Sequence, residues 1–368
     1  MKVNSRLIGF LLLVISLIFT GCGNTNTSTT GTTTPSQSGE PKQEKKEAGK
    51  LTEITISEPV RVLSFAPLYV AIEKGFFKEE GLDVKIASGG GGSQVMATII
   101  SGQAQFGVAA PNAALKTLSA GKEPMVVQSL NSSLTYDIVL SDKFLEKKGI
   151  DPAKQMSTKE KVEMLRGATL ATNNIGDSGD VFLRYTMELY GQKSDDIKVV
   201  KVNGLGPKIA TMKQGVIDGG INSAPFALET ADKKAGRLWI SSFEIPEYSN
   251  MIWEVLFTSK EFANKNHDLV VAAVRAVGKG IEFTRENPKE SAKLIEAYFS
   301  GTSTSLIENG LSSLEKTFVG HGEMTKEAWD NAQTPLIKYS KLTGIEAAAD
   351  TNPGTFWTNQ YIEEAFGK

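Results

Sequence analysis

The chain has 368 residues, of which 40% are hydrophobic and 22% charged, and its formal net charge is −2 at pH 7. This length allows two domains with substantial cores. The slightly acidic balance argues against nucleic acid as a partner, because phosphate backbones are bound by basic patches. The single cysteine, Cys22, excludes a disulfide or a cysteine-rich zinc site within the chain.

The first 21 residues have the pattern of a secretory signal peptide. Lys2 and Arg6 form a charged beginning, and an apolar run follows from residue 7 to residue 19. This run is too short to span a bilayer, which needs about 20 apolar residues. We therefore expect residues 1–21 to be a signal peptide that is removed from the mature protein.

Cys22 comes directly after Thr20 and Gly21. These small residues before a cysteine resemble the lipobox of bacterial lipoproteins, which implies that Cys22 is lipidated. An ordinary signal peptide with an incidental cysteine is the alternative. Residues 22–50 are otherwise polar, so they cannot bury a core and are expected to be a disordered tether. The chain would then be lipid-anchored on the extracytoplasmic face of the cell membrane, in a periplasm or at the cell surface.

From residue 51 onward, predicted strands and helices alternate, as judged from period-2 and from i, i+3, i+4 apolar spacing. Strands are predicted at 54–57, 61–64, 82–87, 105–109 and 125–130, and helices at 67–74, 93–101 and 111–120. This alternation indicates an α/β fold with a parallel or mixed sheet and right-handed crossovers. In such sheets, ligands bind at the carboxyl ends of the strands.

The same order of elements begins again after residue 136. Strands are predicted at 137–141, 169–172, 197–202 and 218–222, and helices at 158–165, 178–190, 207–214 and 224–233. A strand at 251–259 is then followed by helices at 268–284, 289–299, 306–318 and 326–342 and by a closing segment at 353–366. We expect lobe one to comprise residues 51–135 and 251–368, with the C-terminal helices packed on it, and lobe two to comprise residues 136–250. The two crossings would form a double hinge with a cleft between the lobes.

Residues 96–115 and 209–228 also resemble each other without a gap, with Gly102 opposite Gly215 and Gly107 opposite Gly220. Each copy consists of a helix, a glycine, a strand, a loop and a second helix. The likeness predicts equivalent elements in the two lobes, although two α/β units can also match by chance.

The candidate ligand-binding residues of lobe one follow its predicted strands. They are Ser64, Phe65, Pro67, Tyr69, Gly91, Gly92, Ser93, Gln94, Ala110, Pro111, Asn112, Asn131 and Ser132. The glycine-rich loop opens a helix, and helix N-termini carry unpaired N–H groups and partial positive charge, which suit an anionic or carbonyl-bearing ligand. A core position for Phe65 and a plain tight turn at the glycines are the alternatives.

The candidates of lobe two lie at the matching edge. They are Asp177, Ser178, Gly179, Asn203, Asn222 and Ser223, together with Trp253 at the return crossing. Asp177 or Ser178 would also serve as a helix N-cap, which is a sufficient structural explanation for either. Trp253 would line either the cleft or the core. Arg184, Lys116 and Lys208 are basic residues that the pattern does not place.

Enzyme and metal motifs are absent from the sequence. The two histidines, His267 and His321, have no second histidine or cysteine at ligand spacing. There is no nucleophile elbow, Walker loop or dinucleotide-binding glycine motif. We therefore expect no catalytic residue, metal or cofactor, since an enzyme would have to work with carboxylates alone.

The segment 66–84, APLYVAIEKGFFKEEGLDV, resembles substrate-binding lipoproteins of bacterial ABC importers. Residues 93–108, 176–180 and 217–219 also fit their nitrate/sulfonate/taurine and thiamine-precursor class, and the likeness covers about residues 52–300. The resemblance implies a two-lobed fold of the periplasmic binding protein type II-like kind, no catalysis, and a permease and an ATPase as partners. The chain lacks the cysteine-rich motif of the eukaryotic pyrimidine-synthesising relatives.

Our leading hypothesis is a monomeric solute-binding lipoprotein that captures a small anionic or heteroaromatic nutrient, such as a sulfonate, nitrate or taurine-like solute, and delivers it to the permease. A binding protein for a thiamine pyrimidine precursor or an aromatic acid is the first alternative. A sensory module or an enzyme on the same fold is the second.

Overall fold

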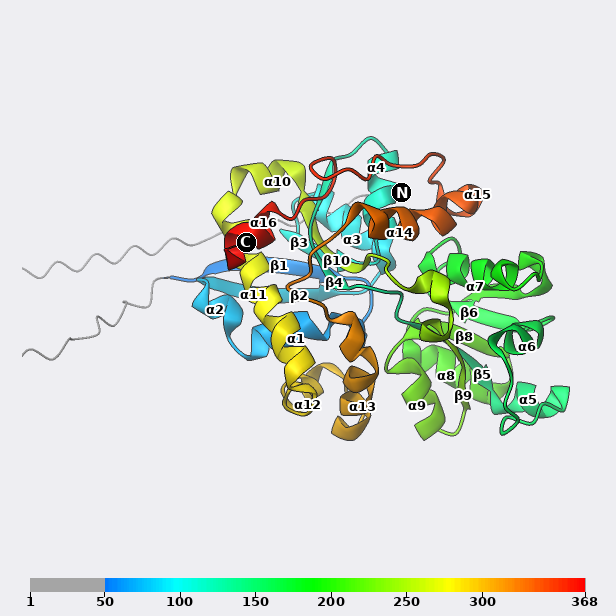
Figure 1. Cartoon of the computed structure of the whole chain (residues 1–368). Coiled ribbons are helices and arrows are strands. Elements are labelled where there is room, and N and C mark those ends of the chain that lie inside the picture. The colour runs from blue at the N-terminus through cyan, green and yellow to red at the C-terminus, as the bar shows by residue number, and fades with distance from the viewer. Residues whose placement is uncertain (1–49, 368) are drawn as a thin grey trace, which may run out of the picture. The chain divides into compact units, whose positions relative to one another are not determined.

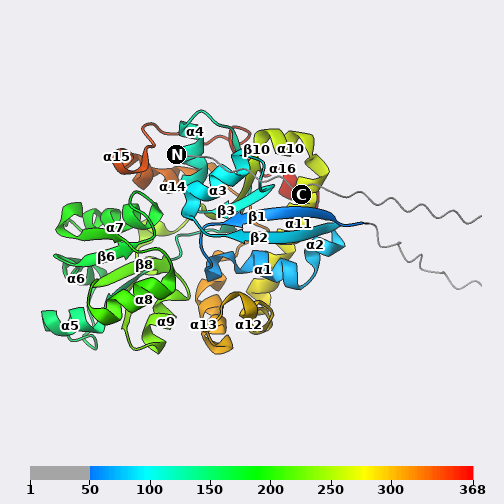
Figure 2. The same ribbon diagram turned by 180° about the vertical axis from the view of Figure 1, so that it is seen from behind.

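The computed structural model describes residues 50–367 (Figures 1 and 2). The predictions of a signal peptide, of lipidation at Cys22 and of a tether therefore lie outside the described residues, except for residue 50. Within the described range, no helix is both long and apolar enough to cross a membrane.

The strands of this range form two sheets of five strands each. The first has the order β2–β1–β3–β10–β4 and the second the order β7–β6–β8–β5–β9. The strands of the first sheet are β1 (Thr52–Glu58), β2 (Leu82–Ser88), β3 (Phe106–Ala109), β4 (Pro124–Asn131) and β10 (Trp253–Ser259). Those of the second are β5 (Tyr136–Ser141), β6 (Thr169–Thr172), β7 (Lys198–Lys201), β8 (Gly219–Ser223) and β9 (Gly236–Ser241).

Both sheets are built in the same way. In each, three neighbouring strands are parallel and the fourth is antiparallel: β10 lies between β3 and β4, and β5 lies between β8 and β9. Strand β10 thus joins the first sheet after the chain has completed the whole second sheet. This pairing confirms the predicted mixed α/β fold.

Helices connect the strands in both halves of the chain. Those of the first half are α1 (Ala66–Glu73), α2 (Phe76–Glu79), α3 (Gly91–Ile100) and α4 (Asn112–Ser119), and those of the second are α5 (Asp142–Lys148), α6 (Thr158–Glu163), α7 (Ser178–Leu189), α8 (Leu205–Gln214) and α9 (Phe226–Asp232). The predicted internal repeat is confirmed for its elements, since α3–β3–α4 corresponds to α8–β8–α9. Gly102 and Gly215 follow the first helix of each copy with positive φ, +73° and +77°.

The C-terminal third is mostly helical. Its helices are α10 (Lys260–Lys265), α11 (His267–Glu286), α12 (Pro288–Ile295), α13 (Thr304–Leu314), α14 (Lys326–Lys338), α15 (Ser340–Thr343) and α16 (Gln360–Phe366). Over the whole described range, short 3-10 turns lie at 63–65, 194–196, 242–244, 246–248, 296–298 and 315–317. Helix α11 buries Val270, Val274, Val277 and Ile281, the predicted i, i+3, i+4 stripe, and packs on α1.

Strand β10 shows how the first sheet is buried on both faces. Val255 and Phe257 belong to the apolar cluster on the side of α3 and α4, whereas Leu256 belongs to the cluster formed with α1 and α11. Successive side chains of a strand point to opposite faces. A central strand between two helical layers therefore buries apolar side chains on both faces, and nearly continuous apolar runs are typical of such strands.

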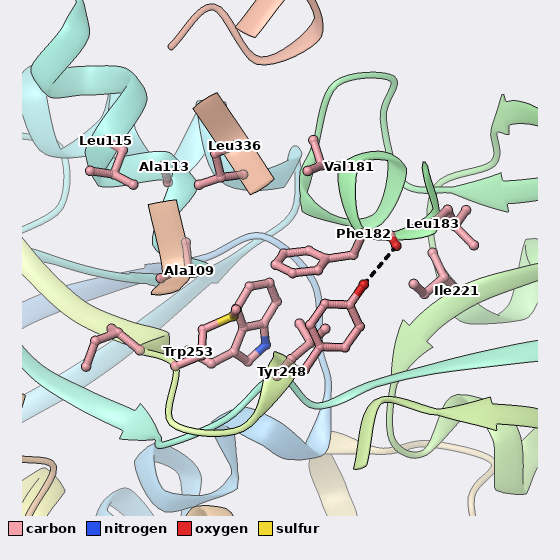
Figure 3. Packing of buried hydrophobic residues seen from close by; sticks show 14 of the residues in the cluster. Ala109, Ala113, Leu115, Val181, Phe182, Leu183, Ile221, Tyr248, Trp253 and Leu336 are labelled. Carbon is pink, nitrogen blue, oxygen red and sulfur yellow. Dashed lines mark hydrogen bonds between the residues drawn. The ribbon is translucent and has the colours of Figure 1, made fainter. Parts of the chain in front are cut away.

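An aromatic group links the two halves of the chain (Figure 3). Trp253 of β10 packs edge-on against Tyr136 of β5 and Phe182 of α7, with ring centroids 5.0 and 5.2 Å away. Tyr248 packs against Phe182 in turn and donates a hydrogen bond to the Phe182 carbonyl oxygen over 3.4 Å. Edge-to-face pairs of this kind contribute about 0.5–1.5 kcal/mol each beyond area burial.

One predicted strand, 61–64, is wrong. The structure has a 3-10 turn at Leu63–Phe65 that leads directly into α1. The Leu63 amide donates to the Ala224 carbonyl oxygen over 2.7 Å and not to a neighbouring strand. The apolar character of this segment reflects burial at a junction between the two halves, which an apolar run of four residues does not distinguish from a strand.

We expect Gly280→Ala to destabilise the fold, because a Cβ at this position of α11 would lie 2.2 Å from the Pro67 carbonyl oxygen of α1. Overpacking of this kind costs about 1–3 kcal/mol. Gly206→Ala in α8 is the matched control, because its Cβ would meet no atom within 4 Å. Chemical denaturation should show a lower free energy of unfolding than wild type only for Gly280→Ala. Equal stability of the two variants would contradict the close packing of α1 on α11.

Candidate functional site

A cavity of about 280 Å³ lies at the carboxyl ends of β1, β3, β6 and β8. Both halves of the chain contribute to it. Its lining consists of Pro59, Val60, Val62, Phe65, Gly90, Gly91, Gly92, Ser93, Ala109, Ala110, Asn112, Ala113, Lys116, Tyr136, Asn173, Asn174, Ile175, Asp177, Ser178, Asn222 and Glu254. Strand ends of two matching sheets thus meet around one space, which is where open α/β sheets bind ligands.

Nine of the predicted ligand-binding residues line this cavity. They are Phe65, Gly91, Gly92, Ser93, Ala110, Asn112, Asp177, Ser178 and Asn222. The other eleven are not part of its lining: Ser64, Pro67, Tyr69, Gln94, Pro111, Asn131, Ser132, Gly179, Asn203, Ser223 and Trp253. Most of these nine residues come from the glycine loop at the start of α3 and from the segments at the carboxyl ends of β6 and β8.

The residues outside the lining have structural partners of their own. Tyr69 is fully buried, donates a short hydrogen bond to Glu58, and stacks on Tyr298. Asn131 and Ser132 line a separate cavity of about 200 Å³. Trp253 belongs to the aromatic group described above, which is the core position that the sequence left open for it.

Helix α3 begins at the cavity without a side-chain cap. Gly90 precedes it with φ +85°, and its first turn contains no acidic residue. Gly91 is also in the left-handed region, and a Cβ there would lie 2.7 Å from the Asn174 side-chain nitrogen of the other half of the chain. The partial positive charge of the α3 N-terminus is therefore not compensated by its own side chains.

The N-terminus of α7 is capped, in contrast. The Asp177 carboxylate accepts hydrogen bonds from the Asp180 amide over 3.0 Å, the Asn174 amide over 2.9 Å and the Thr172 hydroxyl over 2.7 Å. Burial outweighs these bonds and raises the pKa of Asp177. The N-cap explanation for Asp177 is thus confirmed, and most of its acceptor capacity is already used.

Glu254 places a carboxyl group in the cavity. It is only 4% exposed, and within residues 50–367 its side chain accepts one hydrogen bond, from the Ser64 hydroxyl over 3.3 Å. Burial raises the pKa of Glu254 to about 8. Its backbone φ is +43°, a region that non-glycine residues seldom adopt and that costs of the order of 1–3 kcal/mol.

Two lysines bring positive charge to the site. Lys116 lines the cavity and donates to the Gly176 carbonyl oxygen over 3.4 Å, and burial lowers its pKa. Lys208 lies behind the lining, where its ammonium group donates to Asn173 Oδ1 over 2.7 Å. Burial lowers the pKa of Lys208 to about 7.

Asn222 presents an unused donor. Its Oδ1 accepts from the Ser223 amide over 2.9 Å, which leaves Nδ2 buried and without a partner among the described residues. An unsatisfied buried donor costs about 1–3 kcal/mol. Since Asn222 lines the cavity, a ligand acceptor would remove this cost.

Glu254 and Tyr136 are the chief cavity residues that sequence reasoning did not select. Tyr136 lies at the start of β5, and burial, followed by the nearby carboxyls of Glu254 and Asp177, raises its pKa well above the ordinary value. A signal for Glu254 did exist, because it is the one charged residue in the apolar run MIWEVLFTS from 251 to 259. A lone carboxyl in a central strand is rarely retained without a partner or a ligand.

Comparisons with known proteins agree with this arrangement. The model of the family described as NMT1/THI5 like matches residues 63–291. YtlA of Bacillus subtilis is 21% identical over 320 residues, which span 81% of this chain and 86% of YtlA. A 4-amino-5-hydroxymethyl-2-methylpyrimidine phosphate synthase of Aspergillus parasiticus is 25% identical over 312 residues, or 81% of this chain and 83% of the synthase.

Among solved structures, the periplasmic nitrate-binding protein NrtA of Synechocystis PCC 6803 superposes with a TM-score of 0.67 at 16% identity, covering 87% of this chain and 89% of NrtA. The fold is therefore that of the periplasmic binding proteins of ABC importers. The chain belongs to the NMT1/THI5 like family. Its solved neighbours are binding proteins, whereas some of its sequence relatives are named synthases.

The raised pKa of Glu254 predicts a specific pH dependence of stability. Its folded-state pKa of about 8 exceeds the ordinary value of 4.5, so between these values the folded protein holds a proton that the unfolded chain has lost. Stability must then fall as the pH rises through this window. We expect Glu254→Gln to gain at least about 1 kcal/mol over wild type between pH 5 and pH 8, as measured by urea unfolding.

The control for this experiment is Glu123→Gln, because the Glu123 side chain is 76% exposed. Its unfolding should follow the wild-type pH profile. A Glu254→Gln profile parallel to wild type would show that Glu254 is already ionised in the folded protein at pH 5.

Proposed function

We propose that this protein is the solute-binding component of an ABC importer and that it holds a small solute in the cavity between its two sheets. The observation that carries this proposal is the convergence of strand ends from both sheets on one polar, partly buried space. A volume of about 280 Å³ is just below the usual range of ligand pockets, which suits a small nutrient.

The proposed capture involves movement of the two halves. Residues 51–135 with 251–368 would form one lobe and residues 136–250 the other, connected by the crossings before β5 and before β10. Two contacts join the two halves beside the cavity: Lys116 donates to Gly176, and Gly91 lies against Asn174. Such contacts would form on ligand binding and break on release, as in hinged binding proteins.

The proposed setting is extracytoplasmic. Lipidated Cys22 and the tether would hold a monomer at the membrane surface, where it would deliver solute to a permease driven by an ATPase. The family membership and the solved neighbours support this setting, because one neighbour, from Staphylococcus aureus, is described as the ligand-binding component of an ABC-type import system and another as a periplasmic nitrate-binding protein. Growth on a limiting solute source, with and without the gene, would test delivery.

A binding role is also favoured over catalysis. The cavity lining contains no histidine or cysteine, which are the commonest proton-transfer and nucleophilic side chains. The relatives named as phosphate synthases share only 25–26% identity with this chain. Recovery of a chemically unchanged solute after prolonged incubation with the protein would support binding without turnover.

Ligand capture can be tested by thermal unfolding of the domain from residue 51 against sulfonates, nitrate, thiamine pyrimidine precursors and aromatic acids. A ligand at about 100 times its dissociation constant stabilises the folded protein by about 2.7 kcal/mol. We expect one class to raise the unfolding temperature. The absence of a shift with every class would contradict the proposed function.

The neighbouring residues Ser93 and Gln94 provide a matched pair for locating the site. Both are exposed in the first turn of α3, but only Ser93 lines the cavity. We expect Ser93→Ala to weaken binding of the identified solute by about 2- to 10-fold, since a hydrogen bond contributes about 0.5–1.5 kcal/mol. Gln94→Ala should bind like wild type in calorimetry, and equal effects of the two substitutions would place the solute elsewhere.

A further inference from the structure

The cavity lining contains two chemically different sets of groups, and this asymmetry bears on which solute it accepts. One set is the uncapped N-terminus of α3 with the ammonium group of Lys116. The other is the carboxyl group of Glu254, which lies near the Tyr136 hydroxyl. The inference drawn from this asymmetry rests on the proposed function, because it names the class of solute for the same cavity.

Glu254 is costly to the protein in the absence of a ligand. Its carboxyl is buried with a single hydrogen bond from Ser64, and its backbone lies in an unfavourable region of φ. Burial of a carboxyl without full hydrogen bonding and backbone strain both destabilise the fold. Glutamine would retain the shape of the side chain without the charge, so packing alone does not account for a carboxyl at this position.

Of the two carboxyl groups in the lining, Glu254 has the more acceptor capacity left. Asp177 is occupied by the bonds that cap α7, and Tyr136 is a donor that lies close to both carboxyls. Asn222 offers only its Nδ2 donor, since its Oδ1 is already used. A solute with an N–H group would therefore find its acceptor at Glu254.

The N-terminus of α3 and Lys116 contribute donors and positive charge instead. The amides of the first turn of α3 begin at Gly91, and no acidic side chain of that turn offsets their partial charge. Lys116 lies in the same lining, where it makes a 3.4 Å bond to a carbonyl oxygen and lies near the Asp177 carboxyl. A carboxylate, sulfonate or phosphate oxygen would be stabilised there by both.

We infer that the solute is bipolar: an N–H-bearing, positively charged group binds at Glu254, and an anionic or strongly accepting group binds at the α3 N-terminus beside Lys116. A simple oxyanion would bind at α3 and leave Glu254 with its one bond from Ser64. A simple amine would bind at Glu254 and leave Lys116 with its 3.4 Å bond to Gly176 and Asn222 Nδ2 without an acceptor among the described residues. Only a solute with both groups compensates the whole lining.

The proton balance of this arrangement is distinctive. The titratable groups that face Glu254 across the cavity are Tyr136, Asp177 and Lys116, with Lys208 behind Asn173. Burial keeps Glu254 protonated at neutral pH in the free protein. A cationic group at Glu254 favours the carboxylate, so the proton is released to solvent when the solute binds and affinity rises with pH.

Two pairs of probes test the inference: 2-aminoethanesulfonate with ethanesulfonate, and 4-amidinobenzoate with benzoate. The members of each pair share the anionic group and differ in the N–H-bearing cation. Calorimetry on the wild-type domain should give at least tenfold tighter binding for the cationic member of whichever pair binds. Titrations in two buffers of different ionisation enthalpy at pH 7 should show proton release for that member.

Glu254→Gln identifies the residue responsible. This substitution should abolish both the preference within the pair and the proton release, while the anion-only member binds with unchanged affinity. Glu123→Gln should behave as wild type. Urea unfolding of Glu254→Gln establishes that it is folded, and Glu254→Asp, which keeps the charge, should retain the preference in weakened form.

The possible results are separable. Equal or tighter binding of ethanesulfonate or benzoate than of its cationic partner overturns the bipolar class but leaves the solute-binding function in place. The same conclusion follows if a solute without an N–H group emerges from the broader thermal screen while both probe pairs fail. If neither the probes nor the screen yields a ligand, the proposed function itself fails.

Discussion

The structure depends on a strand exchange between its two sheets, by which we mean two crossings of the chain. The chain leaves the first sheet after β4 to form β5, and it returns after β9 to form β10. Strand β10 pairs with β3 and β4 in the first sheet, and β5 pairs with β8 and β9 in the second, although each is reached by a crossing from the other sheet. Their starting residues are therefore held at the junction by backbone hydrogen bonds. Because Tyr136 opens β5 and Glu254 is the second residue of β10, both are brought to the cavity by the same pairing that joins the halves.

The junction combines a stabilising and a destabilising residue in adjacent positions. Trp253 packs edge-on against Tyr136 and Phe182, while Glu254 faces the cavity with one hydrogen bond. The aromatic contacts and the backbone hydrogen bonds of β10 offset the free-energy cost of burying the Glu254 carboxyl and of the positive φ of its backbone. A strained residue persists only where its surroundings over-determine its conformation, and here the strand pairs of Trp253 and Val255 hold the backbone on either side of Glu254.

This arrangement also explains which parts of the molecule the sequence could predict. The alternation of strands and helices, the glycine loop before α3 and the Asp177 cap are local patterns, so they were accessible from single stretches. Residues such as Tyr69 and Trp253 look like ligand contacts locally but lie in the core, because their neighbours come from 71 or more positions away: Tyr298 in one case, Tyr136 and Phe182 in the other. Glu254 was overlooked for the converse reason, since it is one charged residue in an otherwise apolar strand and only the tertiary structure shows that this position lines a cavity.

The same reasoning limits what the fold says about the solute. A TM-score of 0.67 at 16% identity relates this chain to a nitrate-binding protein through its backbone, whereas the lining is composed of side chains that the backbone does not dictate. In this lining the helix N-terminus common to anion sites is accompanied by a buried carboxyl on β10. A carboxyl group and a lysine in one small cavity would constrain the solute at two points, and two fixed points select both chemistry and length. Specificity in this protein would thus reside in the spacing between α3 and β10, which is set by the strand exchange itself.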